Sequence, residues 1–333
     1  MATATQQKID VSARFSHYVD HIAPVWNALP AEIRGEFYVS ADLIEYARIQ
    51  GITARPGLPQ NASRIALVAS WTDFRHVRQR GYRAVYMEHG AGQTYVGLKV
   101  GKNSYVGGDR AGALAVLVPG NRAKELQLAA NPEVPTYVIG CPKLDRYADY
   151  DVADVAPVAI AHHWNCRIAP ETMSAWRHFR PGWKNLVSVH PGAIGHAHPR
   201  IWKEVQHYYS AAGLTLVPLF SDVLDTSSVL AVDNSSVLFE FAATGRPVVV
   251  MNDPRYRRDV HHGGRFWDWA NVGVQVSRPE ALAEAFTEAL EDDTMVVTRR
   301  QEVVSEVYGV PVGSATQAAV DVLSMLVEPA SCT

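Results

Sequence analysis

Short, continuous apolar runs alternate with helix-like segments along most of the chain. Strands that are buried on both faces of a parallel sheet have this continuous character, whereas half-exposed strands alternate apolar and polar residues. The runs predict strands at residues 36–39, 64–69, 83–87, 113–118, 136–139, 158–161, 186–189, 214–219, 229–232, 248–251 and 272–276. Helix-like periodicity marks residues 279–290, 298–308 and 314–326. We therefore predict an α/β protein with two parallel sheets.

A polar segment at residues 144–156 divides the chain near its middle and is typical of a domain boundary. The length of 333 residues also exceeds the usual size of a single hydrophobic core. We predict two Rossmann-like, doubly wound domains at residues 1–154 and 155–310, with residues 311–333 forming a helix that packs back on the first domain. We expect the two domains to face one another across a cleft at the carboxyl ends of their strands, which is where such sheets bind ligands.

Residues 230–253 suggest an anion-binding site, because they read as a strand, a turn, a helix and a second strand. The helix begins at Ser235 and Ser236, which would direct backbone N–H groups, two hydroxyls and the positive end of the helix dipole at one spot. Glu240 lies one turn further along the same helix face, where its carboxylate can accept hydrogen bonds from a ribose. The alternative is an ordinary serine N-cap.

Other polar residues follow the predicted strands and are candidates for chemistry. His89 lies beside Gly90 and Gly92, and a histidine there can take a proton from an acceptor hydroxyl or merely hydrogen-bond the turn. His190 follows another strand and would either donate to a phosphate or fix a Pro-Gly turn. Arg167 has the planar fork that suits phosphate oxygens, unless it forms a surface ion pair.

Asp253 follows the strand after the Ser235–Ser236 helix, where it can accept hydrogen bonds from hydroxyls of a transferred group.

Gly90 and Gly92 begin a Gly-x-Gly motif, but no third glycine follows at the spacing of a dinucleotide fingerprint. The histidine pairs are not at recognised metal-ligand spacings. We therefore predict neither a cofactor nor a metal site.

Composition describes an ordinary globular protein, with 47% apolar and 20% charged residues and a net charge of -3. This net charge does not indicate that the molecule as a whole binds nucleic acid or an anionic membrane. If the acceptor were DNA, the arginine-rich stretches 75–83 and 255–258 would be the first candidates for contact with it.

The 3 cysteines have neither zinc-site nor disulfide spacing, which fits the reducing cytoplasm. No apolar stretch is long enough to span a bilayer, so we predict no integral membrane segment and leave peripheral membrane contact open. The oligomeric state is not predicted.

The order of these motifs resembles the CDP-glycerol glycerophosphotransferases of teichoic acid synthesis. The resemblance covers roughly residues 83–275, and its strongest element is the block from Asp-x-Ser-Ser to Gly-x-Pro. It rests on His89-Gly90, Gly140 to Asp145, His163 to Arg167, His190-Pro191, Asp233 to Ser236, Phe239 to Phe241, Gly245 to Pro247 and Asp253. The resemblance implies the glycosyltransferase-B (GT-B) architecture, a base at His89, and a diphosphate held by His190, Ser235 and Ser236.

Two of these motifs depart from the family pattern. Ala91 follows His89-Gly90 where the family usually continues with Thr-Pro, and Asn234 replaces the tyrosine of Asp-Tyr-Ser-Ser. The acceptor or the transferred group is therefore expected to differ. Nucleotide-sugar transferases and UDP-sugar 2-epimerases share the strand, serine turn and acidic helix, so the architecture does not separate these chemistries.

The sequence thus predicts a metal-independent cytoplasmic transferase that moves a glycerophosphate or glycosyl group from CDP-glycerol or a nucleotide-sugar to an acceptor hydroxyl on a glycan, a protein or modified DNA. The catalytic residues would be His89 and His190. The donor would be held by Arg167, Ser235, Ser236, Glu240 and Asp253. The alternatives are an enzyme like the UDP-sugar 2-epimerases and a nucleotide- or glycan-binding module without turnover.

Overall fold

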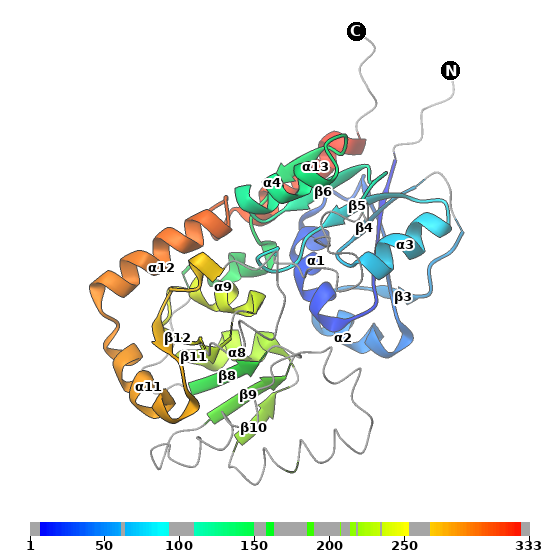
Figure 1. Ribbon diagram of the computed structural model, residues 1–333. Helices are drawn as coiled ribbons and strands as arrows, with labels where there is room; N and C mark the ends of the chain where they lie inside the picture. The colour runs from blue at the N-terminus through cyan, green and yellow to red at the C-terminus, as the bar shows by residue number, and fades with distance from the viewer. Residues whose placement is uncertain are drawn as a thin grey trace, which may run out of the picture. The chain divides into compact units, whose positions relative to one another are not determined.

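The computed structural model describes residues 7–60, 64–92, 110–149, 158–162, 185–189, 207, 214–217, 219–233, 235–252 and 267–327. The chain forms two compact units (Figure 1). Unit 1 comprises residues 1–92, 104–148 and 306–333, and unit 2 comprises residues 93–103 and 149–305. Each unit is built on one parallel sheet, which confirms the predicted fold class.

Unit 1 contains a seven-stranded sheet with the order β3-β2-β1-β4-β5-β6-β7. Its strands are β1 (Ile9–Ala13), β2 (Arg34–Val39), β3 (Ala54–Pro56), β4 (Ile65–Val68), β5 (Arg83–Met87), β6 (Ala115–Val118) and β7 (Thr136–Val138). The strand order reverses between β1 and β4, and the carboxyl ends of the strands beside such a reversal are where doubly wound sheets bind ligands.

Helices cover both faces of this sheet. They are α1 (Ser16–Ala28), α2 (Ile44–Ile49), α3 (Trp71–Gln79), α4 (Asn121–Ala130) and α13 (Ala315–Val327), with short 3-10 turns η1 (Ala41–Leu43) and η3 (Pro142–Tyr147). On one face, Ile22 of α1 and Leu323 of α13 pack in the same apolar cluster as Leu67 of β4. On the other face, Phe74 of α3 packs with Val68 of β4. Successive residues of one strand therefore point into different cores, which is why the strand reads as a continuous apolar run.

Asp145 fastens the last helix to unit 1. Its carboxylate accepts hydrogen bonds from the backbone N–H groups of Gly313 at 2.8 Å, Ala315 at 3.2 Å and Thr316 at 2.6 Å. These groups lie at the start of α13 and have no partner within the helix itself. A side chain distant in sequence therefore caps α13.

Unit 2 contains a six-stranded parallel sheet with the order β10-β9-β8-β11-β12-β13. Its strands are β8 (Val158–His162), β9 (Asn185–Val189), β10 (Leu214–Val217), β11 (Val229–Val232), β12 (Val248–Met251) and β13 (Val274–Val276). The described helices are α8 (Phe220–Thr226), α9 (Ser236–Ala242), α11 (Leu282–Glu291) and α12 (Thr294–Val307), with 3-10 turns η5 (Trp267–Trp269) and η6 (Pro279–Ala281). Phe286 of α11 packs with Val249 of β12 and Ala231 of β11 in the core of this unit.

Each predicted strand and helix overlaps an observed one, but the prediction gave no range for the strands β1 and β3 or for the helices α1, α2, α3, α4 and α8. In β1, Asp10 and Ser12 interrupt the apolar run although both are buried. Asp10 tolerates this position because its carboxylate pairs with Arg64 and accepts a hydrogen bond from the Glu36 N–H at 2.8 Å. The strand β3 has only 3 residues and contains Pro56, so it carries almost no signal.

Candidate functional site

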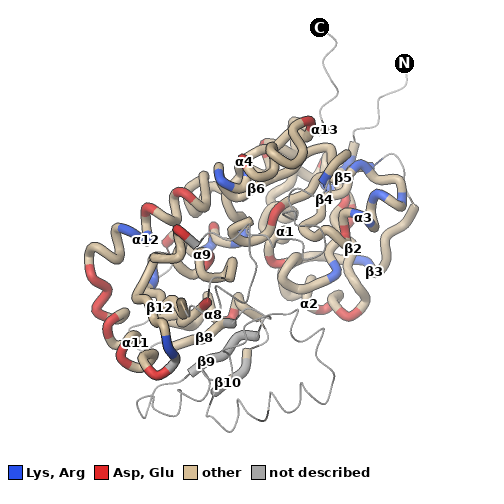
Figure 2. Tube along the Cα trace, in the orientation of Figure 1, with Lys and Arg blue, Asp and Glu red and all other residues tan. Residues whose placement is uncertain are grey.

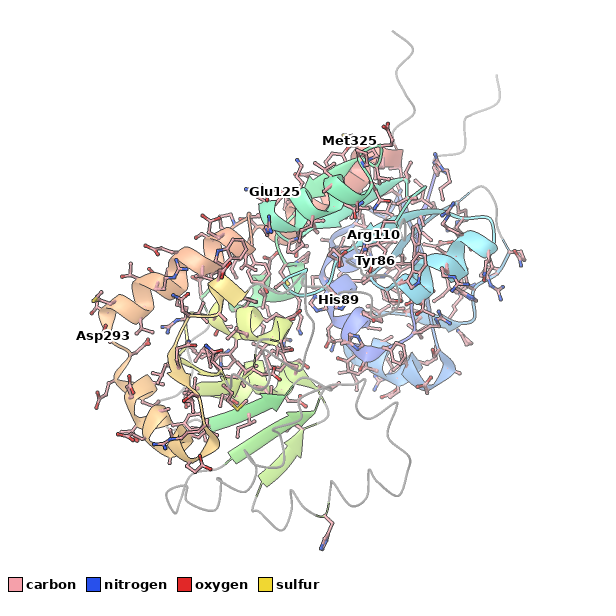
Figure 3. All side chains as sticks on the ribbon, viewed as in Figure 1. Tyr86, His89, Arg110, Glu125, Asp293 and Met325 are labelled. Carbon is pink, nitrogen blue, oxygen red and sulfur yellow. The ribbon has the colours of Figure 1, made fainter. Side chains whose placement is uncertain are left out.

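His89 lies at the carboxyl edge of the seven-stranded sheet, directly after β5 (Figure 3). Its side chain is half-buried, and Nδ1 lies 3.0 Å from the carbonyl oxygen of Ala69, which follows β4. A carbonyl oxygen only accepts, so Nδ1 must donate. In the neutral imidazole the basic nitrogen is therefore Nε2, as general-base chemistry requires.

Two glycines turn the backbone sharply after His89. Gly90 has φ of 60° and Gly92 has φ of 70°, in the left-handed region that favours glycine. The chain thus leaves the sheet edge immediately beyond His89. The prediction that these glycines shape a turn beside the histidine is confirmed.

Three side chains of α1 surround His89 and form with it what we call the ring cluster: His17, Tyr18, His21 and His89. The ring centroids of His17, Tyr18 and His21 lie 6.0, 5.0 and 6.0 Å from that of His89. Sequence reasoning missed them because it missed β1, and β1 is what places α1 at this sheet edge. The signal that could have found them is the aromatic and histidine-rich segment 15–21 that follows Ile9–Ala13.

Burial sets the protonation of the ring cluster. It raises the pKa of Tyr18 to about 12, with the carboxylates of Asp73 and Glu88 adding to the shift. Tyr18 therefore keeps its proton at neutral pH and can donate a hydrogen bond. Burial also lowers the pKa of His21 well below its usual 6.5, helped by the positive charge of Lys143. His21 is thus a neutral imidazole at physiological pH.

Arg14, which follows β1, brings a positive charge to the same edge. Its Nε donates to Asp73 Oδ1 at 2.5 Å, and its side chain stays 35% exposed while that of Asp73 is fully buried. Ser70 Oγ donates to the other oxygen of Asp73 at 2.7 Å and accepts from the Asp73 N–H at 2.9 Å. The charges of Arg14 and Asp73 therefore offset one another, and part of the Arg14 side chain remains exposed at this edge.

A second ion pair lies next to His89 and is almost completely buried. Arg110 pairs with Glu88, and the Arg110 guanidinium carbon lies 4.5 Å from the centre of the Tyr86 ring (Figure 3). Because a buried ion pair loses solvation on both partners, it is weak evidence for stability. The pair holds Glu88, the residue that precedes His89, against Arg110.

In unit 2, the structure brings Ser235, Ser236 and Glu240 together on α9. Ser235 is the N-cap residue and is 4% exposed, yet its side chain makes no capping hydrogen bond to this helix. Ser70 does cap α3 in this way. Ser235 therefore has the position of an N-cap residue, but its hydroxyl does not make the hydrogen bond of an ordinary serine cap. Glu240 is 3% exposed.

Arg167, His190 and Asp253, the remaining predicted site residues, lie outside the described residues. His89 belongs to unit 1 and the α9 residues belong to unit 2.

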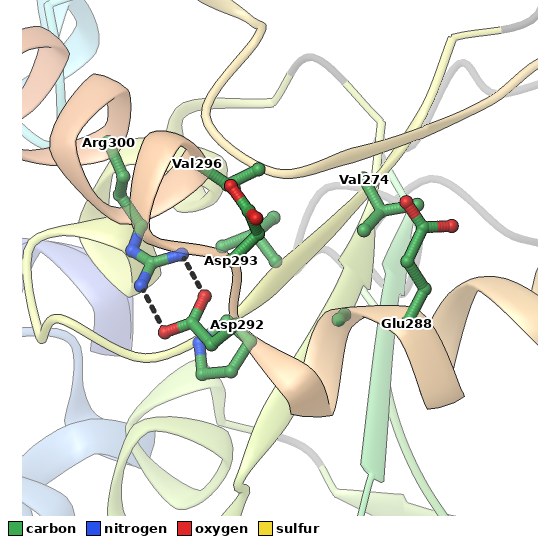
Figure 4. A pocket seen from close by; sticks show the side chains of 9 residues that line it. Val274, Glu288, Asp292, Asp293, Val296 and Arg300 are labelled. Carbon is green, nitrogen blue, oxygen red and sulfur yellow. Dashed lines mark hydrogen bonds and ion pairs between the residues drawn. The ribbon is translucent and has the colours of Figure 1, made fainter.

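A small hollow in unit 2 lies between the sheet and α11 and α12 (Figure 4). Its volume is about 20 Å³, enough for about one water molecule and far below that of a ligand pocket. Arg300 closes it by donating two hydrogen bonds to Asp292, at 3.0 and 2.7 Å, and one to the carbonyl oxygen of Gly245 at 2.8 Å. We regard it as a packing gap.

Within the described part of the chain, no group of three or more histidine, cysteine or acidic residues is arranged to hold a metal ion. The helices of that part include none that is both long and apolar enough to cross a membrane.

No protein-family model matches this sequence, and no curated protein matches it either. Solved structures do match. A variant of the wall teichoic acid polymerase TagF aligns over 98% of this chain and 90% of its own, with a TM-score of 0.65 and 12% identity. A UDP-N-acetylglucosamine 2-epimerase aligns over 99% and 100%, with a TM-score of 0.63 and 16% identity. The UDP complex of MnaA from S. aureus aligns over 93% and 94%, with a TM-score of 0.62 and 15% identity.

These similarities confirm the predicted resemblance at the level of the fold. The chain has the GT-B fold that the teichoic acid polymerase and the 2-epimerases share. At 12 to 16% identity the comparison establishes the fold alone, so the chemistry must be argued from the residues of this chain.

Proposed function

We propose that the protein is a GT-B transferase that moves a glycerophosphate or glycosyl group from a nucleotide-activated donor to an acceptor hydroxyl, without a metal ion. The observation that carries this proposal is the setting of His89. The Ala69 carbonyl fixes the proton on Nδ1, and the residue lies at the sheet edge where doubly wound folds bind ligands. A fixed tautomer at a ligand edge is what a general base needs.

His89 is the proposed base. As the acceptor hydroxyl attacks the donor, its proton passes to Nε2, and the imidazolium keeps its Nδ1 hydrogen bond to Ala69 throughout. Proton removal by a positioned side chain typically contributes a rate factor of about 10² to 10⁴.

Tyr18 and Arg14 supply complementary groups on the same edge. A phenol that keeps its proton can donate a hydrogen bond to the acceptor, because its pKa is about 12. Arg14 adds a partly exposed side chain whose charge is offset by Asp73, so it would offer a ligand hydrogen bonds and no net charge. The edge therefore combines an acceptor of protons with donors of hydrogen bonds.

Donor binding is assigned to unit 2. Ser235 and Ser236 would hold the diphosphate at the start of α9, together with Arg167 and His190, and Glu240 and Asp253 would bind hydroxyls of the donor. The hydroxyl of Ser235 supports this assignment because it makes no capping bond to α9. His190 would also stabilise the departing phosphate, where much of the rate gain of such transfers arises.

A second candidate is isomerisation of a nucleotide-sugar, as in the 2-epimerases. It is favoured by the alignment with a 2-epimerase over 99% of this chain and 100% of that chain. The two candidates differ in their products. A transferase releases a nucleotide and modifies an acceptor, whereas an epimerase returns an intact nucleotide-sugar with inverted stereochemistry.

Replacing His89 tests the proposed base. We expect His89→Gln to lower kcat by about 10² to 10⁴-fold while donor affinity, measured by calorimetry, stays unchanged, since the base acts only in the transition state. His207→Gln, at an exposed histidine of unit 2, is the matched control and should keep full activity. Equal loss of donor affinity in His89→Gln would assign His89 to donor binding and refute the role of base.

A further inference from the structure

Helix α3 carries a strongly basic outer surface. Residues 54–83 contain six arginines. Arg55 and Arg64 are paired with Glu36 and Asp10, which leaves Arg75, Arg78, Arg80 and Arg83, and Asp73 is the one acidic residue of the segment. Asp73 is fully buried and paired with Arg14, so it does not offset the positive charge at the surface. Figure 2 shows the Lys and Arg positions gathered along α3 and the strands beside it. This local charge stands out in a chain whose net charge is -3.

Two arginines of α3 lie over aromatic rings one helical turn before them. The guanidinium carbon of Arg75 is 5.8 Å from the centre of the Trp71 ring, and that of Arg78 is 5.4 Å from the centre of the Phe74 ring. Residues four apart share one helix face, so the repeat holds both guanidinium groups in a row. A side chain that is already held loses less entropy when it binds a phosphate.

Trp71 adds a flat apolar surface at one end of this row. It follows Ser70 at the carboxyl end of β4, and it stays 39% exposed although it stacks on Phe74. Large aromatic side chains are normally buried, so an exposed tryptophan beside arginines is unusual. Phe74 stacks on this ring and the Arg75 guanidinium lies over it, so a base would stack on the part of the ring that these two side chains leave exposed.

We infer that this surface, made of Trp71, Arg75, Arg78 and the exposed Arg83 at the start of β5, binds single-stranded nucleic acid. Phosphates fit the row of arginines, and an unpaired base fits Trp71. A polyanion without rings, such as a sulfated glycan, would use the arginines but would gain nothing from the tryptophan. A duplex keeps its bases stacked on one another, so it would not expose a face to Trp71.

The surface is independent of the proposed transfer, because it needs no donor and none of its four residues is assigned to catalysis. It begins at Trp71, two residues after the Ala69 carbonyl that holds His89. A strand bound along α3 would therefore pass the sheet edge that carries the ring cluster.

The test is fluorescence anisotropy with a labelled oligothymidine about 15 nucleotides long, titrated over a range of NaCl concentrations without donor. Arg75→Ala/Arg78→Ala should weaken binding and lower the slope of log K against log salt by about 1.4, since each lost phosphate contact on a single strand contributes about 0.7. Trp71→Ala should weaken binding about tenfold with an unchanged slope, because stacking is not electrostatic.

The matched control is Arg122→Ala/Lys124→Ala on α4 of the same unit, which should bind like the parent protein. Arg78 also donates to the Ala111 carbonyl at 2.9 Å, so thermal unfolding of every variant is compared, and Arg75→Ala alone repeats the test with that bond intact. Absence of binding at low salt would overturn the inference. So would an unaltered affinity in Trp71→Ala, equal affinity for a duplex, or equal weakening by the α4 control.

Discussion

At the scale of single residues, burial decides which protonation states surround His89. His21 is 3% exposed, and its pKa lies well below 6.5 because burial and the charge of Lys143 both disfavour an imidazolium. Cys141 lies against it, with Sγ 3.9 Å from His21 Nδ1. The folded protein therefore keeps His21 neutral at a pH where the unfolded chain would protonate it.

This difference couples His21 to the pH dependence of stability. Below about pH 6.5 the unfolded chain binds a proton that the folded protein does not, so stability is complete above that pH and falls as the pH decreases. The largest slope from one such group is about 1.4 kcal/mol per pH unit. We expect His21→Gln to flatten the curve of unfolding free energy between about pH 7 and pH 5, measured by urea titration.

The exposed His207 provides the comparison, and His207→Gln should leave that curve parallel to the parent curve. A His21→Gln curve as steep as that of the parent protein would show that His21 is protonated in the folded state, contrary to our assignment.

At the scale of elements, one buried arginine joins three segments of unit 2. Arg300 on α12 binds Asp292 in the turn before that helix (Figure 4). It also donates to the Gly245 carbonyl between α9 and β12. Arg300 is 1% exposed, so each of its bonds is sheltered from water. The packing of α12 on this unit therefore depends on a polar contact as well as on apolar burial.

Removal of this side chain should be costly. We expect Arg300→Ala to lower the free energy of unfolding by about 3 to 5 kcal/mol, because it leaves the partly buried Asp292 carboxylate and the Gly245 carbonyl without the hydrogen bonds from Arg300. Arg299→Ala, at the neighbouring exposed arginine that pairs with Glu302, should change it by less than about 1 kcal/mol. Chemical denaturation measures both, and similar values for the two variants would contradict the structural role of Arg300.

The elements also show how far the sequence can be read. Strands such as β4 and β12 were predictable because both of their faces are buried and every residue is apolar. The strand β1 was not, since Asp10 looks like a surface residue until Arg64 and the Glu36 N–H are brought to it by the fold.

The same limit applies to the candidate site. His89 was predictable from a strand end followed by glycines. The ring cluster was not, because it depends on β1 lying beside β4 and β4 beside β5, and strand order is not a local property of the sequence.

At the scale of the whole molecule, the GT-B fold limits the chemistry without choosing it. Transferases and epimerases share this fold with the chain at 12 to 16% identity. Fold alone does not assign function, so the choice rests on what the residues do to a donor.

The most direct test is to incubate the protein with CDP-glycerol, CDP-ribitol and common UDP-, GDP- and TDP-sugars, each together with glycan, protein and DNA acceptors, and to identify the products by mass spectrometry. We expect at least one donor to release a nucleotide, and release to fall by about 10² to 10⁴-fold in His89→Gln. A nucleoside monophosphate would indicate attack at phosphorus, and a nucleoside diphosphate would indicate attack at a sugar carbon. Release of no nucleotide from any donor, or release that does not depend on His89, would contradict the proposal that this is a transferase with His89 as its base.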